Sequence, residues 1–205
     1  MRFGIKKLDE ILGEIVNGSV ILIEGEGDIP LMFAKEFLKN NVANGHKAFA
    51  LVSERVERIL KEIEGIKILT PNHGFSLQEL FTIALAVQDC KEKVGFIDIF
   101  QQLLIMHDSD RIYNLLSDIC SHIRRKGCVG IITLDKRIVD ERTLAMFENE
   151  ADYVIEIKEV VKKIKIIRGI RVKKSLNMLP SNFYKLHLDE SIEISDEITE
   201  KQRRK

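Results

Sequence analysis

The residues with the clearest chemical potential occupy positions 25–32, between an apolar run and a helical pattern. The run at 20–23 predicts a strand buried on both faces, and the apolar spacing over 31–42 predicts a helix directly after it. The start of such a helix offers free backbone N–H groups at its positive end, which favours an anion. The segment itself, however, carries the acids Glu26 and Asp28. The pattern therefore predicts an anion site whose own charge opposes a phosphate.

The cysteine and histidine residues do not form a pattern typical of a disulfide, a metal site or a catalytic pair. Cys90, Cys120 and Cys128 form no CxxC pair, and the five histidines show no metal-ligand spacing. Cys120 and His122 lie two residues apart on a predicted helix, so they cannot face one another. We expect neither a disulfide framework nor a metal site.

The elements that must position these residues alternate between strand and helix through the first two-thirds of the chain. This alternation predicts a parallel sheet covered by helices. After the first strand and helix, further strands are predicted at 48–52, 67–69, 94–99 and 129–134, and helices at 55–62, 76–89 with Ser76 as its cap, 110–126 and 143–149. Closely spaced strands at 153–157, 163–167, 171–174 and 184–188 predict an antiparallel extension. A ligand site in this architecture lies at the carboxyl ends of the strands that end near Ile23, Val52 and Ile97.

Composition limits the class of protein but names no partner. Lys and Arg number 32 and so do Asp and Glu, which leaves a formal net charge of zero. The chain is too apolar for intrinsic disorder, and its length suffices for a single core. Its longest apolar runs are too short to cross a bilayer and the N-terminus lacks a signal-peptide pattern, so we expect a cytoplasmic protein without a membrane partner. We expect one domain over 1–199 and a disordered basic tail over 200–205.

Several segments resemble the RecA-like P-loop ATPases of the KaiC and RadA type, which include archaeal KaiC-like proteins. Residues 3–13 and 17–25 are similar to the family's approach to its phosphate-binding loop, and 48–54 are similar to its second strand. Val94-Gly95-Phe96-Ile97-Asp98 resembles the strand that ends in the Walker B acid, and residues 124–133 and 151–155 resemble later elements. The resemblance implies a three-layer α/β fold, a RecA-like P-loop NTPase fold with a mainly parallel sheet and C-terminal antiparallel strands.

The sequence departs from the family in the loop itself. A P-loop has the pattern G-x-x-x-x-G-K-[ST], in which backbone amides and the Lys hold the phosphates and the hydroxyl binds magnesium. Here Pro30 replaces the second Gly, Leu31 the Lys and Met32 the hydroxyl residue. The aligned segment is Gly25, Glu26, Gly27, Asp28, Ile29, Pro30, Leu31 and Met32. A unit charge at about 4 Å contributes roughly 4 kcal/mol at an effective dielectric near 20, so loss of the Lys alone can remove up to about three decades of affinity.

Asp28 has two possible roles in this degenerate Walker A loop. Its carboxylate, or alternatively that of Glu26, can fold over the helix start and act as the loop's own anion, so that the domain is stable without a nucleotide. Alternatively it caps the helix, and Pro30 is a proline of the first helical turn.

The resemblance implies roles for three residues outside the loop. Glu54 corresponds to the carboxylate that polarises the attacking water, although Arg55 follows it where a second Glu is frequent. Asp98 corresponds to the Walker B acid, and Lys174 to a residue that reaches into a neighbouring subunit's ATP site, with Leu176 in place of the accompanying Arg. Simpler roles compete: Asp98 can be a solvated acid at a strand end, and Lys174 part of a basic strand edge that discourages aggregation.

Three functions follow. The first is a pseudo-ATPase without a cofactor, retained for assembly or regulation with itself or with an active ATPase relative. The second is a divergent ATP-binding protein or weak ATP hydrolase that binds ATP and magnesium through Glu54, Asp98 and a cation such as Lys35 or Lys174. The third is a DNA-binding recombination accessory protein, suggested by basic clusters at 124–126, 162–174 and 203–205 but not by interleaved aromatic residues. We favour the first.

Overall fold

A single mixed sheet organises the chain. The structure is a computed structural model that describes residues 1–71, 73–163, 165–189 and 191–197, so the expected tail at 200–205 lies outside the described residues. Within them the strands are β1 (Ser19–Gly25), β2 (Ala48–Val52), β3 (Ile66–Pro71), β4 (Gly74–Phe75), β5 (Val94–Asp98), β6 (Val129–Asp135), β7 (Tyr153–Lys162), β8 (Lys165–Lys174), β9 (Tyr184–Leu188) and β10 (Ile192–Glu197). Their order in the sheet is β10-β9-β8-β7-β1-β6-β5-β2-β3-β4.

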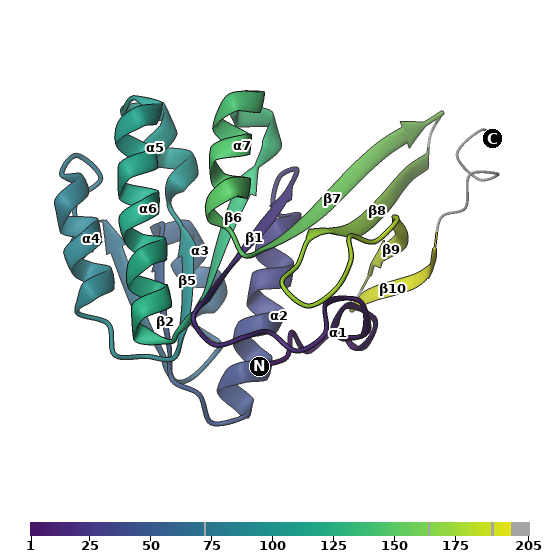
Figure 1. The fold of residues 1–205 in the computed structure, drawn as a ribbon, viewed down its shortest axis with the longest axis horizontal. Coiled ribbons are helices and arrows are strands. Elements are labelled where there is room, and N and C mark those ends of the chain that lie inside the picture. The colour runs from purple at the N-terminus through teal and green to yellow at the C-terminus, as the bar shows by residue number, and fades with distance from the viewer. Residues whose placement is uncertain (72, 164, 190, 198–205) are drawn as a thin grey trace.

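Helices cover both faces of this sheet and give three layers (Figure 1). One face packs against α1 (Lys6–Leu12), α2 (Ile29–Ala43) and α3 (Glu54–Leu60). The other packs against α4 (Leu80–Gln88), α5 (Phe100–Met106), α6 (Ser109–Lys126) and α7 (Glu141–Glu150). A short 3-10 turn, η1 (Lys136–Ile138), follows β6. The α/β class is confirmed, as is the parallel sheet with an antiparallel C-terminal extension.

Strand β1 occupies the centre of the parallel part. It pairs in parallel with β6 on one side and β7 on the other, and all seven of its residues are buried. Strand β6 separates β1 from β5, which in turn pairs in parallel with β2. The carboxyl ends of β1, β2, β5 and β6 therefore meet at one edge of the sheet, where the segments after Gly25, Val52 and Asp98 were expected to lie.

Local signals placed some boundaries correctly and misplaced others. Helix α6 ends at Gly127, which adopts a left-handed conformation with φ of 64°, as the sequence predicts. The prediction that Ser76 caps a helix is wrong, because α4 begins at Leu80 and the Ser76 N–H donates instead to Thr82 Oγ1 at 2.8 Å. Helices α1 and α5 and strand β10 were not predicted, since each has only six or seven residues and so gives a weak periodic pattern.

The strands predicted at 153–157, 163–167 and 171–174 are in fact two long strands. β7 and β8 form one antiparallel hairpin that pairs from Val154↔Lys174 to Lys162↔Lys165, with a register shift between Val154 and Ile155. Figure 1 shows this hairpin extending away from the helical layers. The polar residues between the short apolar runs suggested breaks, but here they lie within continuous strands.

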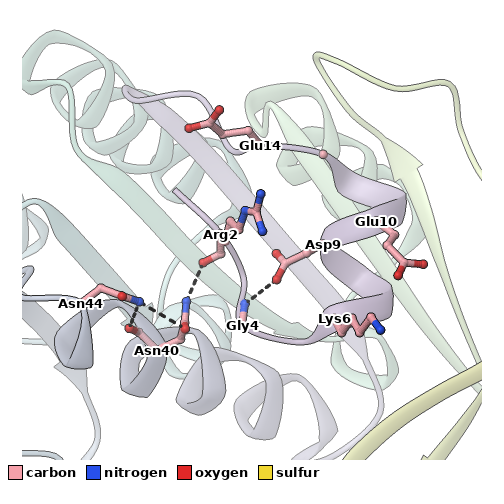
Figure 2. A pocket seen from close by; sticks show the side chains of 9 residues that line it. Arg2, Gly4, Lys6, Asp9, Glu10, Glu14, Asn40 and Asn44 are labelled. Carbon is pink, nitrogen blue, oxygen red and sulfur yellow. Dashed lines mark hydrogen bonds between the residues drawn. The ribbon is translucent and has the colours of Figure 1, made fainter.

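The N-terminal segment docks against the last turns of α2. The Asp9 carboxylate accepts hydrogen bonds from the N–H groups of Phe3 and Gly4, at 2.5 and 3.0 Å, and Asn40 donates to the Arg2 carbonyl at 3.1 Å. Arg2, Gly4, Asp9 and Asn40 are among the residues that line a cavity of about 630 Å³ between α1 and α2 (Figure 2). It lies at the opposite end of α2 from residues 25–28.

No helix in the described part of the chain is both long and apolar enough to span a bilayer.

Close packing between β2 and β5 yields a stability prediction. Gly95 lies opposite Phe49, and a methyl group added at Gly95 would lie 2.6 Å from the Phe49 ring. Gly95→Ala should therefore lower the free energy of unfolding by about 1–3 kcal/mol in urea denaturation. Phe49→Leu removes the clashing ring, so the cost of Gly95→Ala should shrink in the Phe49→Leu background. Additive costs in this double-mutant cycle would contradict the steric explanation.

Candidate functional site

The loop between β1 and α2 contains Glu26, Gly27 and Asp28, and it lies at the carboxyl edge of the parallel strands. Its backbone is tightly held. A Cβ on Gly25 would come within 3.2 Å of both Ile157 and Pro30, and Gly27 adopts a positive φ of 61°. Glycine is thus favoured at Gly25 by crowding and at Gly27 by backbone conformation.

Asp28 does not cap α2. Its side chain makes no capping hydrogen bond, although Pro30 lies in the first turn as predicted. The two oxygens of the carboxylate instead accept one hydrogen bond each from the Arg55 guanidinium, at 2.8 and 2.9 Å. The hydrogen bond from Arg55 is the main cause that lowers the Asp28 pKa. The charge of Asp28 is therefore directed to α3, and neither role considered from the sequence describes it.

The loop does bind an internal anion, but a different residue supplies it. The Gly27 N–H donates to Asp135 Oδ2 at 3.1 Å, across from the end of β6. Asp135 also pairs with the Arg137 guanidinium at 2.5 Å. Burial raises the Asp135 pKa, but hydrogen bonds from Arg137 and Gly27 outweigh burial and leave it lowered. An ionised carboxylate thus contacts a loop amide at this edge.

Leu31 and Met32, which align with the Lys and hydroxyl positions of the P-loop pattern, offer a phosphate neither a cation nor a hydroxyl group. Leu31 is 5% exposed and belongs to the core under α2, and Met32 is a partly exposed side chain without a polar donor. Ile29 is also in that core. The alternative cation Lys35 pairs with Glu62 at 2.6 Å.

Asp98 lies at the end of β5 on the face that carries α2. Thr133 Oγ1 donates a hydrogen bond to its carboxylate, and Gln101 Nε2 donates another at 3.2 Å. Burial raises the Asp98 pKa, while these two hydrogen bonds and the charge of Arg55 act against that increase. Asp98 is therefore a held, largely enclosed carboxyl group and not a freely solvated one.

Glu54 is the first residue of α3 and is exposed. Ser53 caps that helix by accepting a hydrogen bond from the Val56 N–H at 3.3 Å. Glu54 and Arg55 line an open cavity of about 490 Å³, whose other walls are Ser53, Pro71, Leu77, Gln102, Ile105 and Met106. The structure thus places Glu54, Arg55 and Asp98 around one edge, and the role implied for Glu54 stays a prediction.

Lys174 lies away from this edge. Its ammonium donates to the carbonyls of Glu148, Asn149 and Ala151 at 3.1, 3.2 and 2.6 Å. These are free carbonyls at the end of α7, where a cation is favourable. Within one chain Lys174 serves as a helix C-terminal partner, and its implied action on a neighbouring subunit stays a prediction.

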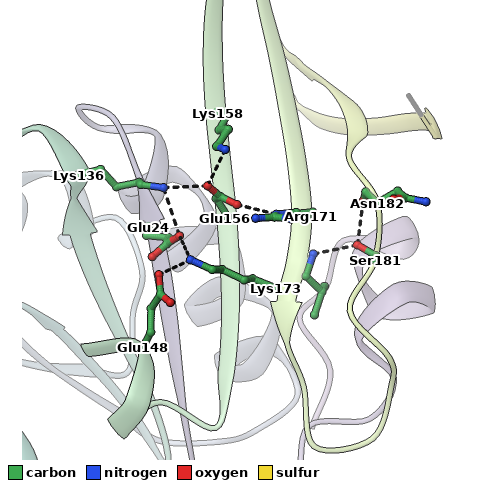
Figure 3. Close-up of polar contacts among 10 residues, drawn as sticks. Glu24, Lys136, Glu148, Glu156, Lys158, Arg171, Lys173, Ser181 and Asn182 are labelled. Atoms are coloured by element: carbon green, nitrogen blue, oxygen red, sulfur yellow. Dashed lines mark hydrogen bonds and ion pairs between the residues drawn. The ribbon is translucent and has the colours of Figure 1, made fainter. Parts of the chain in front are cut away.

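A charged cluster buried beside the loop was not predicted (Figure 3). Glu24 on β1 and Glu156 on β7 are 0% and 2% exposed and share Lys136, which lies 3.4 Å from Glu24 and 2.8 Å from Glu156. Two further cations pair with Glu156: Arg171 at 2.6 Å and Lys158 at 3.2 Å. Lys173 lies 3.8 Å from Glu24 and also pairs with Glu148. The sequence did contain a signal for this cluster, because Glu24 and Glu156 each interrupt an otherwise apolar strand.

The two buried carboxyl groups differ in charge state. Burial raises the Glu24 pKa from 4.5 to about 7, with Glu148 adding to burial and Lys136 and Lys173 opposing it. Glu24 Oε2 has no hydrogen-bond partner among the described residues. Burial also raises the Glu156 pKa, but hydrogen bonds from Lys136 and Arg171 prevail and lower it to about 2. Glu156 is the permanent anion of the cluster, and Glu24 titrates near neutrality.

No group of three or more His, Cys, Asp or Glu side chains in residues 1–71, 73–163, 165–189 and 191–197 is arranged to hold a metal ion.

Comparison with known proteins identifies the fold. No family model matches the chain, and no curated protein matches it in sequence. Among solved structures, it is similar to a KaiC-like protein from the hyperthermophilic archaeon Pyrococcus horikoshii OT3, with a TM-score of 0.76 and 19% sequence identity over 96% of this chain and 98% of the other. The chain has a KaiC-like fold. The three-layer arrangement implied by the resemblance to RecA-like proteins is therefore confirmed, and the similarity at this identity is one of fold.

The pKa of Glu24 gives the cluster a testable pH dependence. The folded chain holds the Glu24 proton up to about pH 7, whereas the unfolded chain releases it near 4.5. The folded state therefore binds more protons in this window, and its stability should fall as the pH rises from 4.5 to 7. Glu24→Gln removes this loss. It should match the wild type near pH 5 and exceed it near pH 8 by up to about 3 kcal/mol in urea denaturation.

Glu156→Gln is the matched control. The Glu156 pKa is lowered to about 2, so its contribution is present above about 4.5 and is lost only as the pH falls toward 2. Glu156→Gln should destabilise the chain by a constant amount between pH 5 and 8. Parallel pH profiles for wild type and Glu24→Gln would show that Glu24 is ionised throughout, contrary to the prediction.

Proposed function

We propose that the chain is a non-catalytic, KaiC/RadA-like pseudo-ATPase that acts in assembly or regulation, with itself or with an active ATPase relative. The observation that carries the proposal is the internal pairing of the loop. The Gly27 amide binds Asp135, and the Asp28 carboxylate binds Arg55. Groups that would otherwise contact a nucleotide phosphate are engaged by the protein's own side chains.

The electrostatics of this edge support the proposal. A triphosphate needs cations and free amides close to its oxygens. The nearby cations Arg55 and Arg137 already pair with Asp28 and Asp135, respectively. A phosphate would have to displace these carboxylates and would remain beside their negative charge. We therefore expect no ATP and no other cofactor at this site.

A divergent ATP-binding protein or weak ATPase is the alternative that a specific observation favours. Asp98 is enclosed and held by Thr133 and Gln101 at the end of β5, while Glu54 is exposed at the same edge. At these places the Asp98 carboxylate could hold Mg²⁺ through water, and the Glu54 carboxylate could orient an attacking water molecule. This function requires that the pairs on the loop open when ATP and Mg²⁺ bind.

A role in DNA binding has less support. Arg124, in the basic cluster at 124–126, pairs with Asp152 at 3.2 Å and with Glu150 at 3.6 Å, so its charge is used at the end of α6. The cluster at 162–174 likewise includes Arg168 and Arg171, which pair with Glu159 and Glu156. These contacts leave fewer cations for phosphates.

The proposal predicts the nucleotide affinity. Isothermal titration with ATP and Mg²⁺ should show no saturable binding at concentrations below about 1 mM, where the binding free energy is near −4 kcal/mol. Phosphate release should equal that of buffer. A Pro30→Gly, Leu31→Lys, Met32→Thr variant restores the motif residues and, combined with Asp28→Ala, should bind ATP more tightly than the wild type, provided that circular dichroism shows it folded.

Micromolar binding of ATP by the wild type would contradict the proposal and favour the alternative. In that case Glu54→Gln and Asp98→Asn distinguish its two forms. Loss of phosphate release with retained binding in both variants indicates an ATPase. Unchanged behaviour in both indicates a site that binds a nucleotide without using these carboxylates.

A further inference from the structure

The buried cluster around Glu24 contains two lysines that are each shared between two carboxyl groups (Figure 3). Lys136 Nζ lies 2.8 Å from Glu156 but 3.4 Å from Glu24 Oε1. Lys173 Nζ is in close contact with Glu148 but lies 3.8 Å from Glu24 Oε1. Both cations are therefore nearer to the other carboxyl group, although Glu24 is the least exposed of the three acids.

These contacts fit a neutral Glu24 side chain better than an ionised one. Only Oε1 has partners, and Oε2 is buried with no hydrogen-bond partner among the described residues. An ionised carboxylate in such a place needs close donors, because a buried charge without compensation is strongly destabilising. The observed distances thus describe the protonated form, in agreement with a Glu24 pKa that burial raises to about 7.

The charged groups that face Glu24 in the described part of the chain come from four elements. They are Lys136 of η1, Lys173 of β8, Glu148 of α7 and Glu156 of β7, the last of which is also held by Lys158 and Arg171. The neighbouring residue on β6 is the apolar Leu134. The two lysines favour the ionised form of Glu24 and Glu148 opposes it. Ionisation of Glu24 therefore attracts η1 and β8 and repels α7.

Lys136 connects the cluster to the loop between β1 and α2. The preceding residue, Asp135, accepts the hydrogen bond from the Gly27 N–H, and the following residue, Arg137, pairs with Asp135. Movement of Lys136 toward Glu24 therefore moves the residue that binds the Gly27 amide. Glu24 itself is only three residues before Gly27 in the sequence.

Lys173 connects the cluster to the end of α7. Glu148 lies in the last turn of this helix, which the Ala151 N–H closes by donating to the Phe147 carbonyl at 3.1 Å. When Lys173 moves toward an ionised Glu24, Glu148 loses its cation and faces a second negative charge. Lys174 still binds the carbonyls at this end of α7, so the helix stays in place while its last turn loosens.

We propose that Glu24 is a proton switch. Loss of its proton to solvent draws Lys136 away from Glu156 and Lys173 away from Glu148, and so changes the hold on the Gly27 amide and on the last turn of α7. The switch needs neither a nucleotide nor a second protein, so it does not depend on the proposed pseudo-ATPase function. It makes the loop at the carboxyl edge of the sheet responsive to pH near neutrality.

Carboxyl ¹³C chemical shifts test the proton site. The full chain, labelled at its glutamate carboxyl carbons, is titrated from pH 5 to 9. One resonance, absent from Glu24→Gln, should titrate with a midpoint near pH 7. Glu26→Gln is the matched control, because Glu26 is two residues away in the sequence and makes no ion pair with the cluster within the described residues. It should keep this resonance and its midpoint.

Amide ¹H–¹⁵N chemical shifts over the same titration test the movement. The amides of Gly27 and Ala151 should shift with the Glu24 midpoint in the wild type and in Glu26→Gln. In Glu24→Gln both amides should stay at their low-pH positions throughout. The five histidines titrate in the same range, so only shifts that Glu24→Gln abolishes report the switch.

Two lysine variants separate the two arms of the switch. Lys136→Gln should abolish the response of Gly27 and leave that of Ala151, whereas Lys173→Gln should do the reverse. Each variant should also move the Glu24 midpoint to higher pH, because it removes a cation that favours the ionised form. A purely structural role for these lysines would not move the midpoint.

Either of two results would overturn the proposal. The first is a Glu24 midpoint below about pH 6 or above about pH 8, which would leave one protonation state dominant near neutrality. The second is a midpoint near pH 7 with amides of Gly27 and Ala151 that respond equally in the wild type and in Glu24→Gln. Glu24 would then bind a proton without moving the loop or α7.

Discussion

The central constraint on this structure is a carboxyl group placed at the end of a fully buried strand. Glu24 lies on β1 between two parallel neighbours and beneath α7, where water does not reach it. Cations from η1 and β8 converge on it and on Glu156, so the cluster ties the parallel half of the sheet to the antiparallel half. Removal of a cation that pairs with Glu156 would leave that ionised carboxylate buried with less compensation, which costs more than an exposed ion pair contributes.

The loop beside this cluster follows the same principle of internal neutralisation. Asp28 of the loop pairs with Arg55, and Asp135 at the end of β6 pairs with Arg137. Asp28 and Arg55 are both more than half exposed, so their pair adds little to stability but occupies the space at the start of α2. These two pairs leave no excess positive charge at the edge, where a bound triphosphate would need it.

The sequence predicted the fold well where local patterns are strong. The buried strand at 20–23, the helix after it and the stop at Gly127 each depend on periodicity or backbone conformation within a few residues. The site was predicted less completely. Positions 25–32, Asp98 and Glu54 were placed at the correct edge, but the partner of Asp28 lies 27 residues away and the anion that binds Gly27 lies 108 residues away.

Those partners could not be predicted because side-chain pairing depends on strand order and register. Lys174 illustrates the limit. Its position near the end of a basic strand suggested an exposed edge, yet its ammonium satisfies three carbonyls at the end of α7, which follows from how β8 lies beside that helix. The buried Glu24 cluster is similar, since only the paired register of β1 and β7 brings Glu24 opposite Glu156.

The outer half of the β7–β8 hairpin, beyond its strand pairs with β1 and β9, also has a consequence for local motion. Its backbone hydrogen bonds depend on one ladder and little buried apolar area, whereas those of β1 are enclosed by a strand on each side and a helical layer on each face. The two regions therefore belong to different cooperative units, and the ribbon can open while the sheet stays closed. Amide hydrogens on the outer ribbon should exchange with solvent orders of magnitude faster than those on β1, which makes this arm the adaptable part of an otherwise rigid domain.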